Sequence, residues 1–164
     1  MPYLLDANVF IQAKLLHYGM DFCPAFWDWL IANNAANEVF SIEKVSDELL
    51  AGGDELGDWA DDRGADFFLK PDPKLLAALS TVSAWAAGQS YEPAAVNTFL
   101  LVADYYLVAY ALAHGYTMVT HEIASTSTKK IKIPEACIGL GIKCVTPYEM
   151  LRTERARFIL RPTP

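Results

Sequence analysis

The sequence has few cysteines and no long run of apolar residues. Its 164 residues include three cysteines, Cys23, Cys137 and Cys144, which form neither a CxxC pair nor a Cys/His spacing that suits zinc. We therefore expect free, mostly packed thiols and no disulfide framework. No apolar stretch reaches the roughly 18 residues of a membrane helix, and the N-terminus lacks the features of a signal peptide. We expect a soluble, cytoplasmic protein that contacts no membrane.

Glycine-rich phosphate-binding motifs are also missing. Neither GxxxxGK[ST] nor GxGxxG occurs in the chain, so the sequence gives no support to P-loop or dinucleotide-binding functions. With 53% hydrophobic residues, however, the chain can bury one substantial core. We predict a single globular domain over residues 1–164.

The net charge of −7 is distributed unevenly along the chain. Residues 43–72 hold ten acidic and three basic residues, whereas residues 129–161 hold eight basic and three acidic residues. The basic end could bind phosphates while the acidic segment faces water or a basic partner. Two solvated helical faces would give the same pattern.

Short apolar segments alternate with longer helical patterns. The predicted strands are 3–5, 38–42, 67–69, 116–120 and 142–146. The predicted helices are 7–18, one from Pro24, one from Ser41 or Glu43 to Leu50, 54–63, 72–88, a Pro-started segment at 92–101, 102–115 and 147–157. Strands separated by helices favour a parallel sheet, so the predicted fold class is α/β, a three-layer α/β/α sandwich with a mostly parallel central sheet.

Four acidic residues lie where the ends of this sheet should bring them together. Asp6 follows the first strand, and Glu122 comes just past the strand at 116–120. Glu48 lies on the helix after the second strand, and Asp104 lies near the start of the helix before 116–120. Ligands of open parallel sheets bind at the carboxyl ends of the strands, so we expect the four side chains to converge there.

A cluster of four carboxylates needs compensation, because the negative charges raise one another's pKa. Mg²⁺ or Mn²⁺ would supply it, since both prefer hard oxygen ligands and bridge to phosphate. Two such ions roughly 4 Å apart can activate water and stabilise the leaving oxygen of a phosphodiester. Asn8 and Thr120 lie beside Asp6 and Glu122 and suit the orientation of ligands or ligand-bound water.

Each acid also has a simpler explanation. Asp6 could cap the helix that begins after it, and Glu122 could cap the loop that follows it. Asp104 and Glu48 could be solvated acids on helix surfaces. Glu43 or Asp47, on the same predicted helix, could take the place of Glu48.

Three segments together resemble a PIN-like domain, the fold of VapC-type toxin ribonucleases. They are LLDANVFI, VSDELLAG and ADYYLVAYALAHGYTMVTHE, which share the order and spacing of the family over roughly residues 3–122. The resemblance implies a metal-dependent endoribonuclease, the toxin of a toxin-antitoxin pair, with RNA as substrate and an antitoxin encoded nearby. It implies that Mg²⁺ or Mn²⁺ is held by Asp6, Glu48, Asp104 and Glu122, with Asn8 and Thr120 in support.

The sequence departs from the family pattern at its last acid. The family usually has Asp in a T-x-D setting, where this chain has Glu122 in THE, which puts full activity and a second metal ion in question. The FWDWL segment and the long middle region indicate a divergent, larger branch. Three lysines follow Glu122 in the sequence and could contact the RNA backbone or belong to a solvated loop. They are Lys129, Lys130 and Lys132.

Two other functions remain as alternatives. A HAD-type phosphatase also has an Asp after its first strand, but Asn8 stands where its second Asp is needed and no late acidic pair follows. A catalytically weak PIN-like binding module would fit Glu122 and the negative net charge. A homodimer could form through apolar helical faces around Trp27 or Trp85. No role is assigned to the three histidines.

Overall fold

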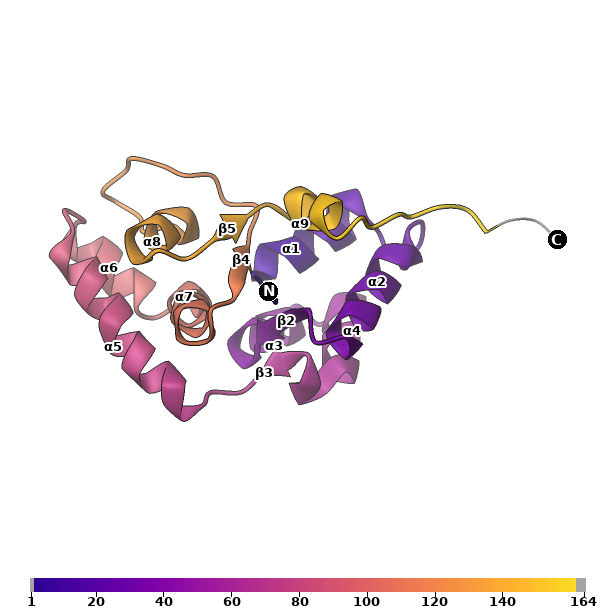
Figure 1. Cartoon of the computed structure of the whole chain (residues 1–164), viewed down its shortest axis with the longest axis horizontal. Helices are drawn as coiled ribbons and strands as arrows, with labels where there is room; N and C mark the ends of the chain where they lie inside the picture. The colour runs from indigo at the N-terminus through magenta and orange to yellow at the C-terminus, as the bar shows by residue number, and fades with distance from the viewer. Residues whose placement is uncertain (1, 162–164) are drawn as a thin grey trace.

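The computed structural model describes residues 2–161, which form an α/β fold (Figure 1). Five parallel strands make one sheet in the order β3-β2-β1-β4-β5. The strands are β1 (Tyr3–Leu5), β2 (Val39–Ile42), β3 (Phe68–Leu69), β4 (Thr117–Val119) and β5 (Cys144–Val145). The predicted three-layer sandwich with a parallel sheet is confirmed, although each strand is shorter than or equal to its predicted length.

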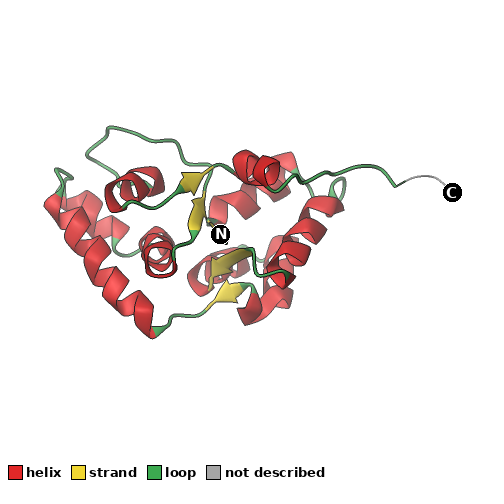
Figure 2. Cartoon of the chain, viewed as in Figure 1, coloured by secondary structure: helices red, strands yellow, loops and turns green. Residues whose placement is uncertain are grey.

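Helices make up most of the described chain and lie on both sides of the sheet (Figure 2). They are α1 (Ala7–Gln12), α2 (Pro24–Ala35), α3 (Glu43–Ala51), α4 (Glu55–Arg63), α5 (Pro73–Gly88), α6 (Pro93–Phe99), α7 (Ala103–His114), α8 (Ile133–Leu140) and α9 (Pro147–Thr153). A π-helix, η1 (Ala13–His17), continues α1, and a 3₁₀ turn, η2 (Gly64–Asp66), precedes β3. Helices α5, α7 and α8 pack together on one side, and α1, α2, α4 and α9 lie on the other (Figure 1).

Local sequence signals explain where several helices begin and end. Asp72 caps α5 by accepting a hydrogen bond from Leu75 N, and a proline occupies the first position of the helix. Thr146 and Glu149 form a reciprocal capping box at the start of α9. Gly115 ends α7 in the left-handed conformation, at a φ of 72°, which glycine adopts without strain.

The sheet and the inner faces of the helices form one apolar core. Leu4, Val39 and Met118, on three adjacent strands, are fully buried. Trp27 is only 4% exposed and packs edge to face on Trp59, with ring centroids 5.0 Å apart. Trp27 therefore belongs to the core.

Three helical segments differ from the prediction. The helix predicted at 7–18 is α-helical only to Gln12 and then widens into the π-helix η1. Helix α9 ends at Thr153 instead of residue 157, and Arg155 after it has a φ of 54°, which an α-helix does not allow. Helix α8 was not predicted, because its eight residues contain Gly139 and are too few to display a clear period.

Among residues 2–161, no single helix is long and apolar enough to cross a membrane. Helices α6 and α7 meet that criterion only when taken together, and they are bent by 71° relative to each other.

The strand order creates a topological switch point between β1 and β4. From β1 the chain adds β2 and β3 on one side of the sheet, then crosses over to add β4 and β5 on the other. Leu5 pairs with Val119, and Asp6 N donates a hydrogen bond to Val119 O at 3.0 Å. The two strands therefore end side by side, and a crevice at such a point is where open α/β sheets bind ligands.

Candidate functional site

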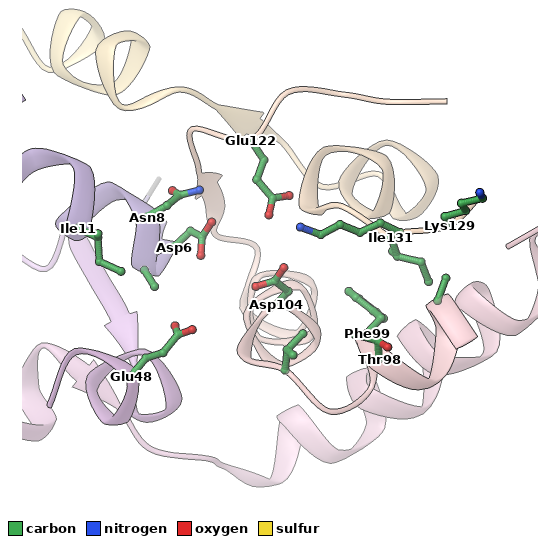
Figure 3. Close-up of a pocket in the computed structure, with 14 residues that line it drawn as sticks. Asp6, Asn8, Ile11, Glu48, Thr98, Phe99, Asp104, Glu122, Lys129 and Ile131 are labelled. Atoms are coloured by element: carbon green, nitrogen blue, oxygen red, sulfur yellow. The ribbon is translucent and has the colours of Figure 1, made fainter. Parts of the chain in front are cut away.

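A cavity of about 540 Å³ opens at the carboxyl ends of β1 and β4 (Figure 3). Asp6, Glu48, Asp104 and Glu122 all line it. They come from four separate segments, and Figure 3 shows their carboxylates directed toward the same space. The convergence that was predicted from the order of strands and helices is thus present in the structure.

Asp6 is the most deeply buried of the four acids. Its side chain is 5% exposed and accepts a hydrogen bond from the Thr120 hydroxyl at 2.8 Å. It stands at the N-cap position of α1 but makes no side-chain capping hydrogen bond. Helix capping therefore does not account for this carboxylate, which is held between the strand end and the cavity.

A small polar network fixes the orientation of Asp6. The Thr120 hydroxyl donates to Asp6 and accepts from Asn8 Nδ2 at 3.3 Å and from the Glu122 backbone N–H at 3.1 Å. Asn8 Oδ1 in turn accepts the backbone N–H of His121 at 3.2 Å. Both polar residues predicted to support the site, Asn8 and Thr120, thus connect the end of β1 to the end of β4.

Burial and mutual repulsion shift the protonation of two of the acids. Burial first, and then the neighbouring Asp104 carboxylate, raises the pKa of Asp6 to about 7, against the Thr120 hydrogen bond. Burial, then Glu122 and Glu48, raises the pKa of Asp104 to about 6, and the charge of Lys130 opposes this rise. A cation bound among these groups would relieve both causes of the shift.

The Glu122 side chain also makes a hydrogen bond outside the cavity. One of its carboxylate oxygens accepts the backbone N–H of Ile133, the first residue of α8, at 2.9 Å. Glu122 thus binds the start of a helix eleven residues further along the chain, instead of the loop directly after it that the sequence suggested. The same carboxylate still borders the cavity.

Of the three candidate acids on α3, only one lines the cavity. Glu48 is exposed and lines the large cavity, while Glu43 and Asp47 line a separate pocket of about 260 Å³ near Tyr106. The geometry thus selects Glu48 over the two alternatives that the sequence left open.

The four acids are the type of ligand that a hard divalent cation prefers, but they lie too far apart to enclose one. Carboxylate oxygens are the ligands that Mg²⁺ and Mn²⁺ prefer, and Mg²⁺ commonly uses one or two carboxylates and keeps several waters. Within residues 2–161, no three His, Cys, Asp or Glu side chains lie close enough together to enclose an ion. Binding by all four acids would therefore require side-chain rotations, which the exposed Glu48 can make most easily.

The three lysines after Glu122 differ in their placement. Lys129 and Lys130 border the cavity, but the Lys129 amine points away from the acids in Figure 3. The Lys132 amine donates a hydrogen bond to Ile123 O at 3.4 Å and does not line the cavity. Lys130 is the lysine whose charge acts on the acid cluster.

A histidine and tyrosine cluster next to the site was not anticipated. Tyr148 Oη and His17 Nε2 are 3.0 Å apart, and the His121 ring centroid lies 5.5 Å from that of His17. Burial and the neighbouring His17 lower the pKa of His121. The three residues come from distant segments, so no local pattern in the sequence could have indicated this cluster.

Comparison with known proteins places the chain in a family. The model of a domain of unknown function, DUF4411, matches residues 3–158. The chain belongs to this family. No curated protein and no solved structure matches it. The family match assigns no activity to the chain.

Proposed function

We propose that this DUF4411 protein is a Mg²⁺- or Mn²⁺-dependent ribonuclease of PIN-like character that hydrolyses RNA phosphodiester bonds. The observation that carries the proposal is the convergence of four carboxylates, from four segments, on one cavity at the switch point of a parallel sheet. The raised pKa values of Asp6 and Asp104 support it, because burial and neighbouring carboxylates disfavour their charged forms, which a bound cation would stabilise.

The four acids, Thr120 and Lys130 each have a part in this proposal. Asp6 and Asp104, with Glu48 and Glu122 at the rim, would hold the cation, which when bound would polarise the phosphate and lower the pKa of a water. The hydroxyl of Thr120 holds the Asp6 carboxylate in one orientation. Lys130 would neutralise a phosphate that enters beside the acids.

The proposal extends to a toxin in a toxin-antitoxin pair. An acidic cavity bordered by exposed apolar side chains such as Val102 suits a partner segment that carries a basic residue. The partner would be an antitoxin encoded beside the gene. Co-expression of the neighbouring reading frame should relieve growth inhibition, and a gene with no small neighbour would argue against this extension.

The direct test is cleavage of a mixed pool of single-stranded and structured RNA. We expect cleavage with Mn²⁺ or Mg²⁺, its loss in EDTA, and a loss of more than about 100-fold in Asp6→Asn, which keeps the shape but removes the charge. Asp61→Asn is the matched control, because Asp61 is exposed on α4 and does not line the cavity. Cleavage that survives in Asp6→Asn would come from another site or a contaminant.

A catalytically weak PIN-like binding module is the second candidate. It is favoured by the hydrogen bond that holds Glu122 on Ile133 N and by the spacing of the acids, which enclose no ion as they stand. Calorimetry with Mn²⁺ separates the two candidates. An absence of metal binding, together with RNA binding that survives Asp6→Asn, would support the binding module.

A further inference from the structure

Two of the three free cysteines form a pair beside the acid cluster. Cys137 lies on α8 and Cys144 on β5, and a hydrogen-bonding interaction between the two side chains shifts the pKa of both thiols. Cys137 is fully buried, whereas Cys144 is half-buried and lines an open cavity of about 250 Å³ that Glu122 also borders. Cys144 is therefore open to a small reagent, whereas Cys137 is shielded from it.

The backbone holds the two cysteines in this arrangement. Ile142 N donates to Cys137 O at 2.9 Å, which closes the turn between α8 and β5, and Gly141 takes up the positive φ of 71° in that turn. Cys144 is fixed by pairing with Met118 in β4. A disulfide then requires the two side chains to close to the S–S length of about 2.05 Å.

We propose that Cys137 and Cys144 are a modification site, at which a small hydroperoxide converts the two thiols into an intramolecular disulfide. The Cys144 sulfur attacks one peroxide oxygen, so that an S–O bond forms, the O–O bond breaks, and one water leaves with hydrogen peroxide as oxidant. The Cys137 sulfur then attacks the sulfenic sulfur of Cys144. The S–S bond forms, the S–O bond breaks, and a second water carries away the remaining thiol proton.

The different exposure of the two cysteines determines the order of these two steps. Cys144 faces the open cavity, so it meets the oxidant first, and Cys137 is shielded until it attacks the sulfenic acid. The hydrogen bond from Cys137 lowers the pKa of the Cys144 thiol, against burial and the nearby carboxylates of Glu122 and Asp6. Cys23, at the start of α2, is the third thiol and has no role in the pair.

The pair is connected to the acid cavity through α8. Ile133, which begins this helix, donates its N–H to the Glu122 carboxylate, and Cys137 follows one turn later. A bond that draws α8 toward β5 would therefore act on the helix end that holds Glu122. Any effect on RNA cleavage rests on the proposed function, whereas formation of the disulfide does not.

The test is a thiol count and peptide mapping of the purified protein before and after treatment with hydrogen peroxide. Thiols are counted in denaturant, so that the buried Cys137 is included. We expect the count to fall from three to one per chain, with a Cys137–Cys144 cross-linked peptide that dithiothreitol reverses. In Cys23→Ser the same two thiols should be lost, so this variant is the matched control.

Single substitutions in the pair sharpen the result. In Cys137→Ser, oxidation of Cys144 should stop at the sulfenic acid, which a dimedone probe detects, and no intramolecular cross-link should form. Earlier loss of Cys23, adducts on single cysteines without a cross-link in the wild type, or no reaction would each overturn the proposal. These outcomes leave the metal and RNA measurements unaffected, so the two proposals fail separately.

Discussion

The acids of the cavity and the acids of α4 carry the same chemical groups in different environments. Asp58, Asp61 and Asp62 on α4 are exposed to water. Asp6 is buried, and it and Asp104 have raised pKa values because burial and neighbouring carboxylates disfavour their charged forms. The acidic stretch that is most prominent in the sequence is thus mostly solvated, and the electrostatic strain lies where single acids meet from distant segments.

The difference follows from the order of the strands. Asp6 and Glu122 are far apart in sequence, but β1 and β4 are neighbours in the sheet and end together. Acids on one exposed helix can spread into solvent and gain little by binding an ion. Acids at a switch point share a confined space, and the proposed function places the cation there.

The largest expected effect on RNA cleavage comes from neutralising an acid inside the cavity, with the same substitution of an acid on α4 as the control. Asp104→Asn should lower metal-dependent RNA cleavage by more than about 100-fold, because it removes a proposed ligand. Asp58→Asn should change the rate less than about twofold, since Asp58 is exposed on α4. Initial rates on one defined RNA check both, and equal losses would remove the distinction between the two groups of acids.

Next in size is the pH dependence of the metal-free protein. The folded-state pKa of Asp6 is raised from 3.8 to about 7, so the native state binds more protons than the unfolded state over that range. The stability of the protein should therefore fall as the pH rises from about 4 to about 7, with Asp104 adding to the fall up to about pH 6.

Thermal melting in EDTA at a series of pH values measures this trend. Asp6→Asn should flatten the slope, because its amide does not titrate. Added Mn²⁺ should raise the melting temperature most at the high end of the range, where the carboxylates are charged. A stability that rises over the same range in both proteins would show that the cavity acids do not control it.

A smaller effect separates two adjacent residues of α3. Glu48→Gln should weaken Mn²⁺ binding by about tenfold, because Glu48 faces the cavity from its rim. Asp47→Asn is the matched control, since its side chain lines the separate pocket. Calorimetric titration of both variants decides the point, and a larger loss in Asp47→Asn would mean that α3 presents a different acid to the ion.

Much of the fold was readable from the sequence because its local signals agree. Pro and Asp at helix starts, Gly115 after α7 and the apolar strands all indicate the same alternation of helix and strand. The positions of the four acids followed from that alternation and from the rule for parallel sheets. The part each acid plays in binding or cleavage stays a prediction.

What the sequence did not indicate depends on contacts between distant segments. The anchor of Glu122 on Ile133, the cluster of His17 and Tyr148, and the contact between the two cysteines each need the folded backbone. Helix α8 was missed for a local reason, its short length and internal glycine. The sequence named Glu48 but left Glu43 and Asp47 open, because the rotation of α3 against the sheet is not fixed by periodicity alone.

The smallest predicted effect concerns an acid with a structural partner, Asp72. Asp72→Ala should lower the free energy of unfolding by about 1 kcal/mol, because the side chain caps α5 at Leu75 N. It also removes the carboxylate that lies 2.7 Å from His114 Nε2 at the end of α7.

The control is Asp61→Ala on exposed α4, which should change the free energy of unfolding by no more than about 0.5 kcal/mol. Urea unfolding of both variants tests this, and because neither residue lines the cavity, both should keep full Mn²⁺ affinity. An acid can thus stabilise the fold through a defined partner without the burial that marks Asp6, and a loss of metal binding in Asp72→Ala would blur that separation.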